Sequence, residues 1–169
     1  MKEKINKMEK ILIENFVIFD ENSLEMVKEW IGGDKNKIKF NLIFKFEKQD
    51  NNRDRFNSVC NVNDPVIFIF ITNKNSIVGA YCPLFNTSED KWISDSKAFV
   101  FSINLNKKYP AQKLGNNYFR GSWGFHFNDI AYCDFNSRKG TFYTSGIYLN
   151  QKELEGNNDS FIFKHFYVY

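Results

Sequence analysis

Cysteine and proline are scarce in this chain, and long apolar runs are absent. The 169 residues include 3 cysteines and 3 prolines. An odd cysteine count without paired spacing does not form a disulfide framework and indicates free thiols in a reducing compartment. No apolar run approaches the roughly 20 residues of a membrane-spanning helix. The first residues interleave Lys and Glu with apolar side chains, which is not the pattern of a signal peptide. These absences predict a cytoplasmic protein without a membrane span.

An excess of one charge is also lacking. The chain has 23 basic and 20 acidic residues, for a net charge of +3. This balance gives no indication of nucleic-acid binding. The length fits one domain, which at this size buries about 70% of the surface of its unfolded chain. We expect a monomeric single domain over 1–169, with a helical N-terminal extension over 1–22 and a core over 23–169.

The residue patterns that carry catalysis or hold metals and cofactors are missing as well. The two histidines, His126 and His165, lie far apart, and neither has a cysteine at the spacing of a zinc site. There is no G-x-S-x-G, P-loop or G-x-G-x-x-G motif. We therefore assign no catalytic, cofactor-binding or metal-binding residue. One alternative stays open, in which Cys60, Cys82 or Cys133 reacts beside a histidine; Cys82 and Cys133 stand at strand ends and fit better as small buried hydrophobes.

Phenylalanine, in contrast, is abundant at 19 residues, and it favours strands. The run 64–72 begins with Asp-Pro and is then apolar on both alternating faces, which is typical of a strand covered on both sides. Residues 73–76 read as a hairpin connection, because Asn tolerates left-handed backbone. Gly79 in the return strand 77–81 indicates a bulge or a closely packed neighbour. Residues 98–103 form a third strand.

The alternation of side chains along these strands predicts the core. Residues two apart share a face of a strand, so the predicted core contains Phe68, Phe70, Phe99 and Phe101. Further strands are expected over 40–46, 129–135 and 161–169, helices over 1–16, 23–31 (capped by Asn22) and 55–60, a turn at Tyr109-Pro110 and a loop over 115–124. The helix over 1–16 fits packing on the sheet, with a partner-binding or membrane-surface helix as the alternative.

Three segments form an ordered series of short motifs. Residues 92–102 read W-I-S-D-S-K-A-F-V-F-S, residues 77–81 read I-V-G-A-Y, and residues 123–130 read W-G-F-H-F-N-D-I. Their order and spacing resemble the TLDc domain family, with its aromatic-x-S-D-S-x-A-F-L-F-S, F-G-G-Y and F-G-x-G-x-D-I segments. The resemblance runs from about residue 23 to residue 169. The positions that carry it include Gly79, Phe99, Phe101, Gly124 and Asp129.

The resemblance implies an α+β fold, mainly an antiparallel two-sheet β-sandwich with flanking short helices. It also implies a link to oxidative-stress resistance and binding to subunits of the vacuolar proton pump. No catalytic mechanism comes with it. Residues and resemblance together favour a non-catalytic protein-interaction domain over an enzyme. The alternative is a redox-active or enzymatic protein that acts through a reactive cysteine.

Two polar segments that contain tryptophan, 87–97 and 115–126, are the expected partner-binding loops. Loops carry recognition, and aromatic side chains in polar surroundings are typical interface anchors. The predicted interaction surface consists of Trp92, Asp95, Lys97, Trp123 and His126. In the competing interpretation both tryptophans are buried in the sandwich and close its ends.

Overall fold

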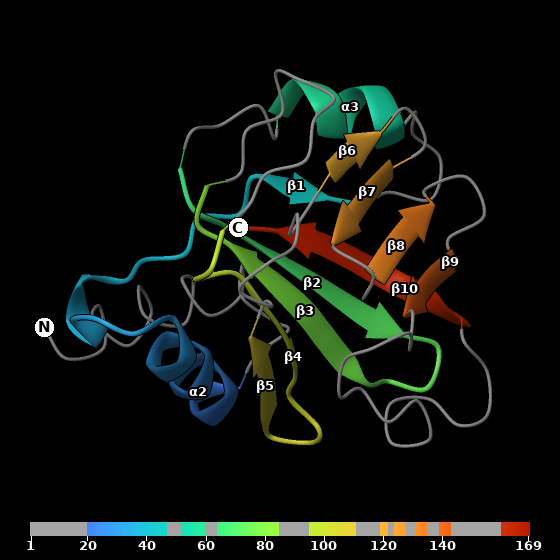
Figure 1. Ribbon diagram of the computed structural model, residues 1–169. Helices are drawn as coiled ribbons and strands as arrows, with labels where there is room; N and C mark the ends of the chain where they lie inside the picture. Colours follow the sequence, from blue (N-terminus) through green and yellow to red (C-terminus); the bar gives the residue numbers. More distant parts are fainter. Residues whose placement is uncertain are drawn as a thin grey trace, which may run out of the picture. The chain divides into compact units, whose positions relative to one another are not determined.

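The computed structural model describes residues 20–46, 52–59, 64–84, 95–110, 119–121, 124–127, 131–134, 139–142 and 160–169. The chain divides into two compact units, Met1–Leu42 and Ile43–Tyr169. In the first unit the described elements are helix α2 and a short 3-10 helix, η1; the strands and helix α3 belong to the second (Figure 1). The helix expected over 1–16 lies outside the described residues, and the single domain with its boundary at 22/23 stays a prediction.

Helix α2 spans Glu21–Ile31 and is capped at both ends. The Asp20 carboxylate accepts a hydrogen bond of 2.7 Å from the backbone N–H of Ser23. Hydrogen bonding with the Ser23 side chain, and then with its backbone N–H, lowers the pKa of Asp20. Gly32 ends the helix with a φ of 84°, a conformation that glycine adopts without strain. The end at Ile31 was predicted correctly. The predicted cap, Asn22, is wrong, because Asp20 stands two residues earlier and already binds the orphan N–H.

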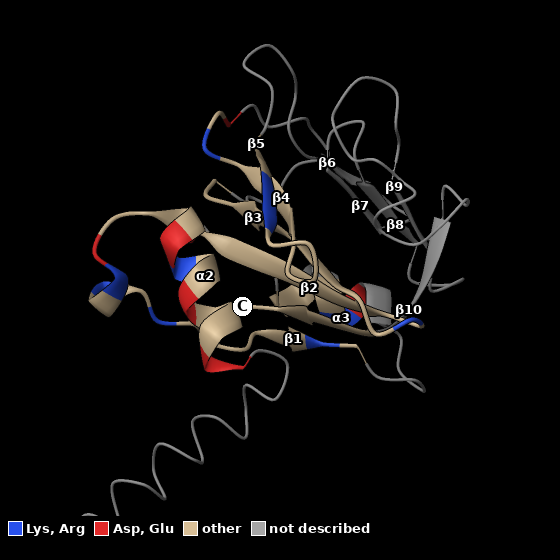
Figure 2. Ribbon diagram, turned by 90° about the horizontal axis from the view of Figure 1, so that it is seen from below, with Lys and Arg blue, Asp and Glu red and all other residues tan. Residues whose placement is uncertain are grey.

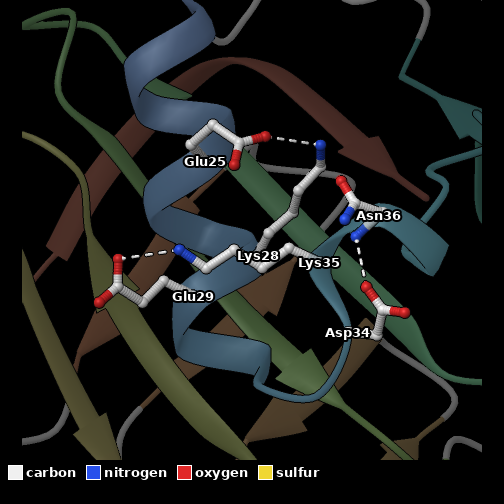
Figure 3. Close-up of polar contacts among 6 residues, drawn as sticks. All are labelled: Glu25, Lys28, Glu29, Asp34, Lys35 and Asn36. Atoms are coloured by element: carbon white, nitrogen blue, oxygen red, sulfur yellow. Dashed lines mark hydrogen bonds and ion pairs between the residues drawn. The ribbon is translucent and has the colours of Figure 1, made fainter.

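The 3-10 helix η1 spans Lys35–Lys37 and is tied to α2 by charged side chains. Lys35 Nζ lies 3.3 Å from Glu29 Oε2. The Asp34 carboxylate caps η1 by accepting a hydrogen bond of 3.1 Å from the Asn36 N–H. Within α2, a second ion pair of 2.7 Å joins Glu25 and Lys28. Figure 3 draws these contacts, which are surface interactions of small energy.

The second unit is built on an antiparallel sheet of six strands among the described residues. The order across it is β5-β4-β3-β2-β10-β1, so the last strand of the chain lies inside the sheet. Together with the two helices this makes an α+β fold. The strands are β1 (Phe44–Lys45), β2 (Val66–Thr72), β3 (Ile77–Cys82), β4 (Phe99–Ser102), β5 (Lys107–Pro110) and β10 (Ser160–Val168).

Strand β10 also joins a second antiparallel ladder. Its first residues, 160–162, pair with β9, while residues 163–168 pair with β2. The β2 register shifts between Phe163 and His165, so Lys164 is the extra residue of a bulge. Beyond β9 the order continues to β8, β7 and β6. These strands are β6 (Phe119–Gly121), β7 (Gly124–Phe127), β8 (Ala131–Asp134) and β9 (Lys139–Phe142).

One face of the six-stranded sheet holds a phenylalanine cluster centred on β10. The ring of Phe166 lies 4.5 Å from that of Phe70 and 6.1 Å from that of Phe68, with nearly parallel planes. Phe44 of β1 and Phe56 of α3 (Asn52–Val59) complete the cluster, at 5.8 and 6.1 Å from Phe166. All five side chains are buried. Helix α3 therefore covers this face, called the α3 face below.

The opposite face is organised around Gly79. Directly paired residues of antiparallel strands point to the same face, and Gly79 pairs with Ile69 and Phe101. A Cβ atom on Gly79 would collide with the Phe101 ring and with the Phe68 carbonyl oxygen. The predicted close neighbour is thus the Phe101 ring, and the predicted bulge is absent, since the β2–β3 register runs unbroken through Gly79. All four phenylalanines of the predicted core are buried, as expected.

Local patterns placed most elements correctly and some boundaries wrongly. The strand predicted over 40–46 is observed only over Phe44–Lys45, although the backbone N–H groups of Ile43 and Phe46 also donate hydrogen bonds to β10. The turn predicted at Tyr109-Pro110 is wrong, because both residues belong to β5. The N–H of Ile103, just after β4, donates a hydrogen bond to the Ile77 carbonyl oxygen, so the odd-numbered residues along this strand direct their backbone groups toward β3. Phe99 is one of them, and its partner Pro110 on β5 is therefore in a pair without hydrogen bonds, with the proline nitrogen pointing away from β4. Proline is tolerated on such a strand edge.

The later expectations are confirmed in part. The helix predicted at 55–60 is α3, the strand at 129–135 is β8, and the strand at 161–169 is β10. Part of the loop predicted at 115–124 is strand β6, and Gly124 begins β7. The remaining residues of that loop lie outside the described ranges. The two-sheet sandwich stays a prediction.

Replacing Phe166 by alanine removes the ring that contacts four other phenylalanines. We expect Phe166→Ala to lower the free energy of unfolding by about 3–5 kcal/mol, through lost burial and the cavity left behind. Urea denaturation followed by circular dichroism measures this loss. Leu84→Ala is the matched control, because Leu84 is 58% exposed, and it should change stability by less than about 0.5 kcal/mol. Equal losses in the two variants would contradict the assigned core.

Candidate functional site

The predicted loop 87–97 belongs to the connection between β3 and β4. Tyr81 near the end of β3 pairs with Phe99 at the start of β4, so the two ends of the connection lie side by side. The described parts are residues 83–84 and 95–98. Leu84 is 58% exposed, and few large hydrophobic side chains in the described part of the chain are so open. These ends define the β3–β4 corner.

Asp95 shapes the β3–β4 corner by bonding to the backbone. Its Oδ1 accepts a hydrogen bond of 2.9 Å from the Lys97 N–H, and its carbonyl oxygen accepts one of 3.2 Å from the Ala98 N–H. This is the turn that an aspartate favours by binding the backbone two residues on. The Asp95 side chain is buried, whereas Ser96 and Lys97 are exposed. Asp95 is thus a positioning residue, and Lys97 is presented to solvent.

The corner also holds a thiol that is kept protonated. Cys82 is fully buried, and burial raises its pKa well above the ordinary thiol value; the nearby Asp95 carboxylate raises it further. Burial, and then the charge of Asp95, likewise raise the pKa of Tyr81. Only the thiolate is nucleophilic, so a buried thiol with a raised pKa is inert. The interpretation of Cys82 as a small buried hydrophobe is confirmed.

The structure brings together two of the five residues of the predicted interaction surface. Asp95 and Lys97 share one turn, as described above. His126 lies on β7, opposite Phe119 and Tyr132. Trp92 and Trp123 lie outside the described residues, as does Asp129 of the predicted motif set. The five-residue surface as a whole stays a prediction.

Sequence reasoning missed two features of the corner. Leu84 was not singled out, although it follows a proline at the end of a strand. The proximity of Asp95 to Cys82 has no signal in the sequence, because the two residues stand at opposite ends of the β3–β4 connection and only the pairing of β3 with β4 brings those ends together. Among the residues that the structure describes, no three His, Cys, Asp or Glu side chains are grouped as a metal site would require. No helix in those same ranges has both the length and the apolar character to cross a membrane.

Comparison with known families identifies the class of this protein. The model of the TLDc domain matches residues 12–127, more than half of the chain. The chain therefore belongs to the TLDc domain family. No protein of curated function is matched by the sequence. The matched region includes the β3–β4 corner and ends with β7, so β8, β9 and the central strand β10 lie beyond it.

Thiol labelling tests the assignment of Cys82. In native protein at pH 7, we expect maleimide to modify Cys82 at least about tenfold more slowly than in unfolded protein, because the thiol is buried and protonated. Peptide mapping by mass spectrometry separates Cys82 from the other two cysteines. Asp95→Asn keeps an oxygen for the Lys97 N–H but removes the charge. It should therefore shift the labelling profile of Cys82 to lower pH. Native labelling as fast as in denaturant would refute the assignment.

Proposed function

We propose that this chain is a non-catalytic protein-interaction domain of the cytoplasm. The observation that carries the proposal is the turn at Asp95, where a buried carboxylate fixes an exposed lysine at the same corner that holds an exposed leucine. Lys97 offers a charge that selects and orients a partner, while Leu84 offers apolar surface that binding removes from water. A positioned turn of this kind costs little entropy to dock. Such an arrangement suits recognition rather than bond chemistry.

Family membership supports the class of partner. Resemblance to TLDc domains implies a link to the vacuolar proton pump, and we propose subunits of that pump as the partners of this chain. A contribution to oxidative-stress resistance would then act through the partner complex. Trp92 belongs to the same β3–β4 connection as Lys97, and we place it in the binding surface with Trp123 and His126. The domain acts as a monomer in this proposal.

The finer fold is part of the same proposal. We infer that the ladder from β9 to β6 forms the second sheet of a β-sandwich, with β10 shared between the two sheets. The bulge at Lys164 supports this, because a bulge bends its strand and increases the local twist. It falls between the residues of β10 that pair with β9 and those that pair with β1.

The competing function, a protein that reacts through a cysteine, loses one of its three candidates. Cys82 is buried and its raised pKa keeps it protonated. That function would rest on Cys60 or on Cys133. Measuring peroxide consumption by the purified protein, with Cys60→Ser and Cys133→Ser variants as controls, decides between the two functions. Peroxide consumption that disappears in one variant would favour the cysteine.

A charge reversal at Lys97 tests the interaction surface. We expect Lys97→Glu to weaken binding to the purified soluble part of the vacuolar pump by about tenfold, which is ~1.4 kcal/mol. Lys107→Glu on β5 makes the same charge change at the other end of the sheet and should bind within about twofold of wild type. Titration by interferometry measures both constants, and thermal melts confirm the fold. Wild-type affinity of Lys97→Glu would remove the β3–β4 corner from the proposal.

A further inference from the structure

A row of partly exposed isoleucines crosses the face opposite the α3 face, at the far end of the sheet from the β3–β4 corner. Ile71 pairs with Ile77, and the Ile103 N–H donates a hydrogen bond of 3.0 Å to the Ile77 carbonyl, so the three residues lie side by side on one face. His165 of β10 pairs with Ile71 and extends the row by one strand. All three isoleucines are only partly buried, and His165 is exposed. These four residues are called the isoleucine row.

Hydrogen bonds at the adjoining turns hold the isoleucine row in place. Asn104 Oδ1 accepts a hydrogen bond of 2.7 Å from the Ile77 N–H, which ties the β4–β5 turn to the first residue of β3. Thr72 and Ser76 close the β2–β3 turn, with the Thr72 N–H donating to the Ser76 carbonyl at 2.9 Å and the Thr72 hydroxyl oxygen accepting from the Ser76 N–H at 3.1 Å. A surface fixed in this way loses little conformational entropy when it is covered.

Among the described residues of the six strands and of the two adjoining turns, the charged side chains are all basic. Exposed Lys74 stands in the β2–β3 turn on one side of the row. Exposed Lys108 stands on the other side, in β5, where it pairs with Phe101, two residues along β4 from Ile103. The Lys108 ammonium lies 4.6 Å from the centre of the Phe99 ring, which places it on the same face. The residues of the six strands and of the two turns include no Asp or Glu. Figure 2 shows blue but no red on the described parts of these strands.

We propose that the isoleucine row is a docking surface for an acidic amphipathic helix of a partner protein, lying across the strands. Neighbouring strands are about 4.8 Å apart, close to the roughly 5–6 Å between side chains three or four residues apart on a helix. From β4 to β10 the row spans about 14 Å, the length of about ten helical residues. Apolar side chains of the helix cover Ile71, Ile77 and Ile103, and its flanking carboxylates meet Lys74 and Lys108.

The same surface is a poor fit for a lipid bilayer. The β2–β3 turn that projects beyond the row reads Asn73-Lys74-Asn75-Ser76 and has no apolar side chain to insert. Asn75 has a φ of 65° and so belongs to a tight turn. Membrane-binding surfaces combine basic residues with apolar groups that enter the interface. Here the apolar residues lie on the flat face of the sheet and the polar turn stands at its end, which favours a protein partner.

Methyl NMR with a defined probe tests this proposal. The probe is a synthetic helical peptide of about 15 residues, with leucines on one face and glutamates on its flanks. We expect it to shift the methyl resonances of Ile71, Ile77 and Ile103, with binding that weakens as salt is added. Lys74→Glu combined with Lys108→Glu should raise the dissociation constant at least about tenfold. Lys97→Glu, the same charge change at the β3–β4 corner, should stay within about twofold of wild type.

Three results of these binding experiments would overturn the proposal. Equal binding of a matched peptide with lysine in place of every glutamate would show that charge does not select the partner. Methyl shifts elsewhere, or none at about 1 mM peptide, would show that the row is not the docking surface. Binding to phosphatidylserine vesicles without peptide binding would assign the row to a membrane. Ile77→Thr, a β-branched replacement checked by thermal melting, should weaken peptide binding. None of these results changes the pump-binding assay of Lys97→Glu, so the two proposals fail independently.

Discussion

The burial of the Phe166 ring is the interaction on which the rest of the second unit depends. Phe166 stands in β10, which pairs with β2 on one side and with β1 and β9 on the other. Its ring meets Phe70 and Phe68 from β2, Phe44 from β1 and Phe56 from α3. These contacts join segments more than 90 residues apart in sequence with the last strand of the chain. Such long-range pairing is formed late and slowly in folding.

The central place of β10 also sets the geometry of everything attached to it. A straight strand could continue a single flat ladder, whereas the extra residue at Lys164 bends β10 where its neighbour changes from β9 to β1. The family match ends at residue 127. The matched region therefore contains the β3–β4 corner but not β10, the strand whose Phe166 ring closes the core. The corner and β10 are connected through β3 and β2, which are hydrogen-bonded to each other and, through β2, to β10.

The central hairpin could be predicted from sequence because its signals are local. Apolar runs, asparagines in the turn and alternation of side chains suffice for β2, β3 and β4. The errors arise where a distant partner decides. Asp20 and Asn22 are both good caps, and only the bonded Ser23 N–H distinguishes them. Strand β1 is short because it pairs with only two residues of β10, Tyr167 and Val168. Pro110 fits a strand only because its nitrogen faces outward from the sheet.

The candidate site shows the same limit. The motif S-D-S-K marks a turn with Lys97 exposed, but the proximity of the buried Asp95 to Cys82 requires the two ends of the β3–β4 connection to meet. The isoleucine row could not be found from sequence, since its members come from β2, β3, the β4–β5 turn and β10. A hydrophobic residue on a strand reads as core by periodicity alone, and only the pairing across strands shows that Ile71, Ile77 and Ile103, all partly exposed, gather at one end of one face.

The two surfaces stand at opposite ends of the same rigid element. Strand β3 runs from Ile77 in the isoleucine row to Cys82 beneath the β3–β4 corner, a distance of about 17 Å at the rise of an extended strand. A single helix lying across the strands covers one end only, so the surfaces can hold different segments at the same time. A partner with several subunits would meet both, and the second contact would then form at high effective concentration. Modest affinity at each end is enough for tight binding of an assembly, because the sheet fixes the distance between them.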